Sequence, residues 1–287
     1  MNQSVQDSML SETDLFQVRS LIEERSGMVF DHSRARFFTN RVREYLEVKG
    51  LARASELMRR IKASNADYDE FLERVLTQET SFFRYPAIFQ ALEQRVLPEV
   101  QARKFWTNPR RIRVWSAGCS TGEEPYSIAI SICQALEGAE TWDARVLATD
   151  ISRNALSIAS SGRYLRRELT YMGLDRLERY FERCGGEYVV RPRIRQMVEF
   201  APLNLAQMVY MGRFDCIFCM NVLIYFSESL RANLIRRFVE YLEPGGYLFL
   251  GHAESVAKAC VELEPIVVGD SLIYRKPLIR TDAGANQ

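Results

Sequence analysis

Two glycines and two glutamates are crowded into one short segment, Gly118-Cys-Ser-Thr-Gly122-Glu123-Glu124. Glycines let a backbone approach a ligand closely, and this turn follows an apolar run that ends at Trp115. The spacing fits neither the GxGxxG dinucleotide fingerprint nor a P-loop, because no Gly-Lys-Ser/Thr sequence follows. Carboxylates at a helix start would repel a pyrophosphate but suit a cation. The segment therefore favours S-adenosylmethionine, whose sulfonium and amino groups are positive, over NAD or ATP.

Further polar residues follow later apolar runs in an order that supports the same ligand. Asp150 ends the second run, where a carboxylate can accept hydrogen bonds from two ribose hydroxyls. The alternative is that Asp150 only caps the next helix. Asn204 is placed to bind an adenine edge, and Asn221 directly follows the run expected to form the central strand. The segment His252-Ala-Glu254 follows the last run, and its role is left open.

Alternating strands and helices must position these side chains. Apolar runs predict strands at residues 111–115, 145–149, 198–200, 214–218 and 247–250, with helices after the first, second and fourth. This alternation indicates an α/β fold with a mostly parallel, doubly wound sheet, which binds ligands at the carboxyl ends of its strands. Residues 162 to about 197 interrupt the alternation with many arginines and a β-like segment. We expect a small inserted β-subdomain there.

The N-terminal residues lack a buried-strand pattern and predict a separate helical domain. Helices are expected from the Ser11 cap to Gly27, over 33–48, over 55–62 and over 68–77, which gives domains 1–88 and 89–287. Between residues 34 and 62, nine basic residues and three acidic ones leave an excess of +6. That excess indicates either an ordinary solvated helix face or a docking surface for an acidic partner.

Composition and charge exclude several classes of protein. The 287 residues are 47% hydrophobic and 26% charged, which suits a folded chain, and the net charge of +1 argues against a nucleic-acid binder. No apolar run approaches the ~18 residues of a membrane span, and the start lacks a secretion signal. We therefore expect a soluble, cytoplasmic protein without direct membrane insertion. A monomer is expected as well, although composition does not determine the oligomeric state. Cys216 and Cys219 have metal-like spacing, but buried thiols in a strand are the favoured interpretation, and no metal site is predicted.

Four segments are specific in combination: Thr80-Ser-Phe-Phe-Arg84, Trp115 to Ser127, Ala148-Thr-Asp150 and Phe218 to Phe226. Together they resemble the CheR family, the chemoreceptor glutamate O-methyltransferases of bacterial chemotaxis. The likeness runs from about Leu15 to about Lys276. It implies an N-terminal helical domain that recognises receptors, a Rossmann-like class I methyltransferase domain and a small β-subdomain inserted in it.

The resemblance also implies an activity and a set of site residues. The expected reaction moves a methyl group from S-adenosylmethionine to glutamates on the cytoplasmic helical bundle of methyl-accepting chemotaxis receptors. S-Adenosylhomocysteine and glutamate 5-O-methyl esters are the products, and the modification serves sensory adaptation. Carried over by position, the cofactor contacts fall on Gln78, Thr80, Ser81, Arg84, Gly118, Glu124, Asp150, Asn204, Leu205 and Asn221.

The substrate side of the site is expected to involve two further groups. Arg84 and Tyr225 would orient the incoming carboxylate, the alternatives being a structural salt bridge and a buried tyrosine. The basic surface would steer receptor helices through Arg41, Arg43, Arg53, Arg59 and Arg60. A glutamate titrates near ~4.3, so the nucleophile is already ionised at neutral pH and the reaction needs no general base.

Three features depart from the family pattern. Gln78 stands where Asn is usual, and Met220 stands where an arginine commonly precedes the asparagine. The segment from Cys184 to Val190 is short, so this chain is similar to the members that do not grip a receptor's C-terminal pentapeptide.

Two other functions stay open. The first is a methyltransferase that acts on another substrate, either a nucleic acid or a small molecule. A nucleic-acid enzyme would be expected to have broader positive charge and an Asn-Pro-Pro-Tyr-like motif, whereas Asn221 is followed by Val-Leu-Ile-Tyr. A non-catalytic scaffold that binds cofactor or receptors is the other, and the intact set of site residues argues against it.

Overall fold

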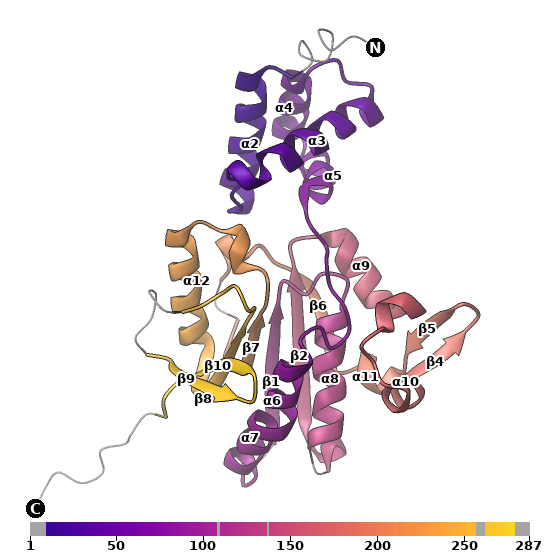
Figure 1. Cartoon of the computed structure of the whole chain (residues 1–287), viewed down its shortest axis with the longest axis vertical. Helices are drawn as coiled ribbons and strands as arrows, with labels where there is room; N and C mark the ends of the chain where they lie inside the picture. Colours follow the sequence, from indigo (N-terminus) through magenta and orange to yellow (C-terminus); the bar gives the residue numbers. More distant parts are fainter. Residues whose placement is uncertain (1–9, 108–109, 137, 210, 257–261, 279–287) are drawn as a thin grey trace, which may run out of the picture. The chain divides into compact units, whose positions relative to one another are not determined.

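The computed structural model describes residues 10–107, 110–136, 138–209, 211–256 and 262–278. The chain divides into two compact units (Figure 1), the first being Met1–Thr77 with Tyr225–Leu230, and the second Gln78–Ile224 with Arg231–Gln287. The expected boundary at residue 88 differs from this division, because Phe82 and Phe83 are buried in the core of the second unit. None of the helices in the described part of the chain has the length and apolar character that a membrane crossing requires.

Local capping signals account for the helices of the first unit. Ser11 caps the first helix and Gly27 ends it with a φ of 79°, while Asp31 and Gly50 bound the second helix in the same way. The fourth helix begins earlier than residue 68, because the Ser64 side chain accepts a hydrogen bond from a backbone N–H of its first turn. The four predicted helices are therefore confirmed as α2 (Glu12–Ser26), α3 (His32–Lys49), α4 (Ala54–Ala63) and α5 (Asn65–Val75).

The second unit is built on a seven-stranded sheet of order β6-β2-β1-β7-β8-β10-β9. The five strands from β6 to β8 run parallel, and β10 and β9 are antiparallel additions at one edge. The five predicted strands are confirmed, while the β9–β10 hairpin was not expected. The strands are β1 (Arg111–Ala117), β2 (Asp143–Asp150), β6 (Val198–Pro202), β7 (Phe214–Cys219), β8 (Leu242–Leu250), β9 (Glu264–Val268) and β10 (Ser271–Arg275).

Helices pack on the sheet through alternating strand residues. Val114 of β1 joins the core formed with α6 (Pro86–Ala91), a π-helical turn (Leu92–Val96), α7 (Leu97–Lys104) and α8 (Glu123–Ala135). The next residue, Trp115, points to the other face and packs edge-on against Phe238 of α12 (Glu228–Tyr241), at a ring distance of 5.4 Å. Successive side chains of a strand point to opposite faces, so both faces of β1 are buried.

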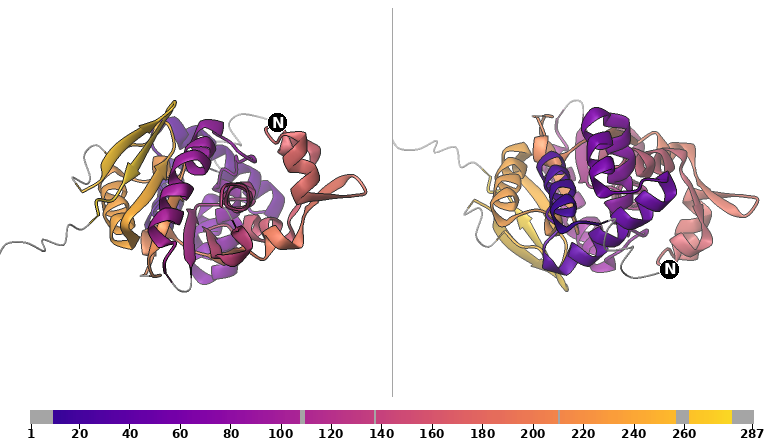
Figure 2. Two further views of the ribbon diagram at one scale, coloured as in Figure 1. Left: turned by 90° about the horizontal axis from the view of Figure 1, so that it is seen from below. Right: turned by 90° about the horizontal axis from the view of Figure 1, so that it is seen from above.

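A small antiparallel sheet of order β3-β5-β4 is inserted between β2 and β6. Figure 2 shows it at the opposite end of the central sheet from the β9–β10 hairpin. Tyr164 connects it to the rest of the second unit, because its ring packs on Phe82 at 4.8 Å and its hydroxyl donates to the carbonyl of Thr121, in the turn after β1, at 2.8 Å. The insert and its flanks contain α9 (Arg153–Ser161), β3 (Arg163–Leu165), α10 (Leu174–Tyr180), β4 (Phe181–Cys184), β5 (Glu187–Val190) and α11 (Pro192–Arg195).

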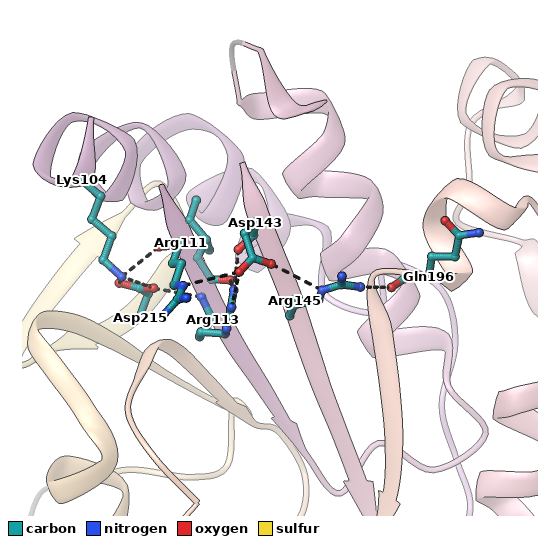
Figure 3. Close-up of polar contacts among 8 residues, drawn as sticks. Lys104, Arg111, Arg113, Asp143, Arg145, Gln196 and Asp215 are labelled. Carbon is teal, nitrogen blue, oxygen red and sulfur yellow. Dashed lines mark hydrogen bonds and ion pairs between the residues drawn. The ribbon is translucent and has the colours of Figure 1, made fainter. Parts of the chain in front are cut away.

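Ion pairs tie together the amino ends of the parallel strands (Figure 3). The buried Asp215 carboxylate accepts hydrogen bonds from Lys104 Nζ at 2.7 Å and from the Arg113 backbone at 3.0 Å. On the neighbouring strand, Asp143 contacts Arg113 and also Arg145, the latter at 3.5 Å. Each of these carboxylates is paired with a cation at the amino edge. Doubly wound sheets bind ligands at the opposite edge, where the carboxyl ends of the strands lie.

Candidate active site

The glycine-rich turn connects β1 to α8 and needs glycine at both ends. Gly118 and Gly122 have φ angles of 86° and 97°, a region that other residues rarely adopt. A Cβ atom at Gly118 would lie 2.4 Å from Val222 Cγ2, so the turn packs directly on the segment that follows β7. The backbone N–H groups of Gly118 and Cys119 donate to the Thr149 carbonyl at 2.8 and 2.9 Å. The turn is therefore fixed to the carboxyl ends of two strands.

Asp150 joins the glycine-rich turn to the end of β2. One carboxylate oxygen accepts a hydrogen bond from the Ser120 backbone at 2.8 Å, and the other accepts from the Ser152 backbone at 2.9 Å. The helix cap considered as an alternative is provided instead by Ser152, whose hydroxyl accepts from Ala155 N. Asp150 therefore shapes the turn as well as presenting a partly buried carboxylate at the sheet edge.

Glu124 presents a second carboxylate at this edge, and its surroundings disfavour the charged form. Burial raises the pKa of Glu124 to about 7, although Ser116 Oγ donates to the carboxylate at 2.6 Å. The neighbouring Glu254 raises the pKa further, and Arg84 lowers it. Two carboxylates around one guanidinium leave a surplus of negative charge, which suits a cationic ligand.

Arg84 is held beside these acids by its own segment. Its guanidinium donates to the Glu79 carbonyl at 2.6 Å and to the Glu79 carboxylate at 3.0 Å. The side chain of Glu79 is 80% exposed, so this ion pair lies in water and contributes little to stability. A second anion can therefore reach the Arg84 guanidinium by displacing Glu79.

Glu254, whose role the sequence left open, organises the segment after β7. Its carboxylate accepts hydrogen bonds from the backbone N–H groups of Asn221 at 2.8 Å, Gly251 at 2.7 Å and Ile224 at 3.2 Å. Asn221 itself has a φ of 62°, which is uncommon for a residue other than glycine. Tyr85, which the sequence did not single out, donates its hydroxyl hydrogen to Asn221 Oδ1 at 2.9 Å.

Comparisons with known proteins agree with this geometry. The family described as CheR methyltransferase, SAM binding domain, matches residues 78–267. Chemotaxis protein methyltransferase 1 of Pseudomonas aeruginosa is 34% identical over 275 residues, covering 92% of this chain and 97% of the relative. The chemotaxis protein methyltransferase of Salmonella typhimurium is 37% identical over 263 residues, covering 88% of this chain and 87% of the relative. This chain belongs to the CheR methyltransferase family. It is an S-adenosylmethionine-dependent methyltransferase with the class I fold, as the sequence motifs predicted.

Other residues expected to contact S-adenosylmethionine also lie at the carboxyl edge of the central sheet. Gln78 donates its amide N–H to Ser152 Oγ at 3.0 Å, next to the Asp150 turn. Asn204 follows β6 and accepts a hydrogen bond from Ala206 N at 3.0 Å, which caps a short 3-10 helix beginning at the buried Leu205. Thr80 and Ser81, between Gln78 and Arg84, are partly buried.

Tyr225 lies in the first unit of this CheR-family chain, whereas Arg84 lies in the second. The Tyr225 carbonyl accepts a hydrogen bond from the Val29 backbone at 2.8 Å, and the Arg34 guanidinium lies 4.2 Å from the centre of its ring. The Tyr225 side chain is partly buried. The joint action of Arg84 and Tyr225 on a substrate stays a prediction.

The arginines expected to dock the receptor lie on α3, on α4 and, for Arg53, at the N-cap position of α4. Arg41 pairs with Glu44 at 2.7 Å, and Arg43 donates to the Asn40 side chain at 3.1 Å. Arg41 and Arg43 are two residues apart on α3, so they point to different sides of the helix. The side chains of the remaining three are exposed: Arg53, Arg59 and Arg60.

The cysteine pair of β7 is not arranged as a metal site. Cys216 and Cys219 are fully buried in the strand, and burial raises the pKa of both thiols. The prediction of buried thiols in a core strand is confirmed. Throughout the described ranges, no three His, Cys, Asp or Glu side chains are grouped closely enough to hold a metal ion.

Proposed function

We propose that this enzyme methylates glutamate side chains on the cytoplasmic helical bundle of methyl-accepting chemotaxis receptors. The observation that carries the proposal is the cluster of Glu124, Glu254 and Arg84, whose surplus negative charge suits a methyl donor that is itself a cation. The names of the relatives, chemotaxis protein methyltransferases, support receptors as the methyl acceptor. The products are then S-adenosylhomocysteine and glutamate 5-O-methyl esters, which serve sensory adaptation.

The residues at the carboxyl edge fit the cofactor group by group. Bound S-adenosylmethionine supplies a methyl group made electrophilic by the adjacent sulfonium. In this proposal Asp150 accepts from the ribose hydroxyls, Asn204 binds the adenine edge and Glu124 faces the positive groups. Gly118, whose missing Cβ lets the turn pack against Val222, contacts the cofactor through its backbone in this proposal. The other members of the cofactor set are Gln78, Thr80, Ser81, Arg84, Leu205 and Asn221.

The acceptor carboxylate needs positioning more than activation. A glutamate has a pKa near ~4.3, so at neutral pH it carries the lone pairs that attack the methyl carbon without losing a proton first. Arg84 orients this carboxylate after exchanging its exposed partner Glu79, and Tyr225 acts with Arg84 as the second orienting group. Exclusion of water from the reacting pair strengthens the attraction of the two opposite charges.

The receptor approaches through the basic surface of the first unit, in this proposal. Methylation regions rich in glutamate are attracted by Arg41, Arg43, Arg53, Arg59 and Arg60, which raises the rate of encounter at low salt. The hairpin turn between β4 and β5 is short, spanning Gly185 and Gly186, which supports action without a receptor pentapeptide. A monomer in the cytoplasm completes the proposal, since the acceptor glutamates lie on that side of the membrane.

Transfer of radiolabelled methyl groups tests the reaction. Purified enzyme, labelled S-adenosylmethionine and receptor cytoplasmic fragments should give receptor label that is released as methanol by mild base, as an ester requires. Arg84→Ala should lower turnover while its thermal unfolding stays close to that of the parent chain. Label that appears only on nucleic acid or on a small molecule, or no label with intact cofactor binding, would refute the proposal.

The docking surface is tested by charge reversal. The double variant Arg59→Glu, Arg60→Glu should raise the Michaelis constant for the receptor fragment several-fold, while the dissociation constant for S-adenosylmethionine stays unchanged. Arg74→Glu on α5 is the matched control, because Arg74 is also an exposed arginine of the first unit. If the double variant and the control behave alike, the surface does not dock the receptor.

A further inference from the structure

The segment before α6 has a strained backbone. Phe83 and Tyr85 have φ angles of 52° and 111°, although neither is glycine, and such conformations persist only when the surroundings enforce them. The enforcing contacts are visible, since Phe83 is buried and its N–H donates to Ser127 Oγ at 3.0 Å. Backbone strain of this kind is concentrated at functional sites, which directs attention to where the Tyr85 side chain goes.

The strained segment brings the Tyr85 hydroxyl to Asn221, 136 positions later in the chain. The hydroxyl donates to Asn221 Oδ1 at 2.9 Å, and the ring is held edge-on against His252 at 4.7 Å. The backbone N–H of Asn221 is fixed separately by Glu254. Within the described part of the chain, the Asn221 amide nitrogen has no hydrogen-bond partner of its own.

We infer that Tyr85 is a positioning residue for the cofactor, acting through Asn221. Because the Tyr85 hydroxyl donates to Asn221 Oδ1, the amide oxygen faces Tyr85 and the two amide N–H groups are left as donors for an acceptor atom of S-adenosylmethionine. Phenylalanine would satisfy the ring contact with His252 equally well, so the hydroxyl is the part that matters. This inference rests on the proposed role of Asn221 as a cofactor contact.

A double-mutant cycle measured by titration calorimetry tests the inference. Tyr85→Phe should weaken the binding of S-adenosylmethionine by up to about tenfold, because the freed amide can present its oxygen instead of its nitrogen. Asn221→Ala should weaken binding at least as much, and the double variant should bind like Asn221→Ala alone. Steady-state kinetics of Tyr85→Phe should show a higher Michaelis constant for the cofactor with the receptor constant unchanged.

A matched control separates positioning from stability. Tyr247→Phe also removes a hydroxyl that donates to another side chain, that of Glu99, in the same unit but away from the cofactor residues. It should alter thermal unfolding without altering cofactor affinity.

Two results overturn the inference in distinguishable ways. If Asn221→Ala weakens binding but Tyr85→Phe does not, or if their effects add, Tyr85 does not act through Asn221 and the proposed function stands. If Asn221→Ala binds the cofactor normally, the proposed contact at Asn221 is wrong, and the inference fails with it.

Discussion

Protonation of Glu124 should control cofactor affinity in the neutral pH range. Burial raises the pKa of this carboxyl from 4.5 to about 7, so roughly half of the cofactor-free molecules carry it protonated at pH 7. A cationic ligand beside the carboxylate favours the ionised form, and binding therefore releases a proton. Below the pKa, each unit of pH should weaken S-adenosylmethionine binding by up to about tenfold, and affinity should level off above it.

Calorimetry between pH 5.5 and 7.5, in buffers of different ionisation enthalpy, measures both the affinity and the proton released. Glu124→Gln should bind S-adenosylmethionine more weakly at pH 7.5 and should lose most of the pH dependence. Glu123→Gln is the matched control, since burial raises the pKa of Glu123 to about 7 as well, but its carboxylate accepts from Thr121 Oγ1 at 2.7 Å. S-Adenosylhomocysteine lacks the sulfonium charge and should show a smaller dependence.

In the cofactor-free protein, the Glu124 carboxyl should make stability fall as the pH rises, whereas cofactor affinity should increase. Because folding raises the pKa of Glu124, its contribution to stability is fully present below pH 4.5 and is lost as the pH rises through about 7. The rise from 4.5 to about 7 corresponds to about 3 kcal/mol at most. Glu124→Gln should therefore unfold at a higher temperature than the parent at pH 8. The affinity prediction would be refuted if S-adenosylmethionine binding did not change with pH. It would also be refuted if the pH dependence disappeared in Glu123→Gln rather than in Glu124→Gln.

Four other substitutions follow from the geometry. Gly118→Ala should lower the free energy of unfolding by about 1–3 kcal/mol in chemical denaturation, because its Cβ would lie 2.4 Å from Val222 Cγ2 and its φ is 86°. In Asp150→Asn, an amide NH2 group replaces one of the two carboxylate oxygens that accept hydrogen bonds from backbone N–H groups. Calorimetry should show that S-adenosylmethionine binds at least about tenfold more weakly. Asp215→Asn removes the fully buried carboxylate that pairs with Lys104, whose side chain is 21% exposed, so thermal unfolding should show a loss of up to about 3 kcal/mol with cofactor affinity unchanged. Asp143→Asn, whose side chain is 37% exposed, should lose less than about 1 kcal/mol.

Local patterns predicted what depends on local chemistry. The glycine-rich turn, its acids and the strands that end at the site follow from apolar periodicity and from glycine spacing, which neighbouring residues determine. The position of Asp150 was also predictable, but its hydrogen bond from the Ser120 backbone was not, since Ser120 comes from another strand's turn. The hairpin of β9 and β10 carried a readable signal, the Gly269-Asp270 turn between apolar runs.

Long-range packing accounts for what the sequence could not indicate. The boundary at residue 88 was placed where the pattern changes, whereas the compact unit begins at Gln78, because Phe82 and Phe83 are buried in its core. Tyr85 precedes a proline at a helix start and has no local feature that distinguishes it. The role inferred for Tyr85 depends on its hydrogen bond to Asn221, which lies 136 positions away in the sequence.

Strain and desolvation are concentrated at one edge of the sheet. Within the described ranges, the four residues other than glycine with positive φ are Phe83, Tyr85, Ser120 and Asn221. Each belongs to a segment that borders the acidic cluster, where burial also disfavours the charged form of Glu124. At the amino edge, by contrast, the carboxylates are matched by cations (Figure 3). A cation bound at the carboxyl edge relieves the penalty on the ionised acid there, so the cofactor completes a site that the fold leaves electrostatically unbalanced.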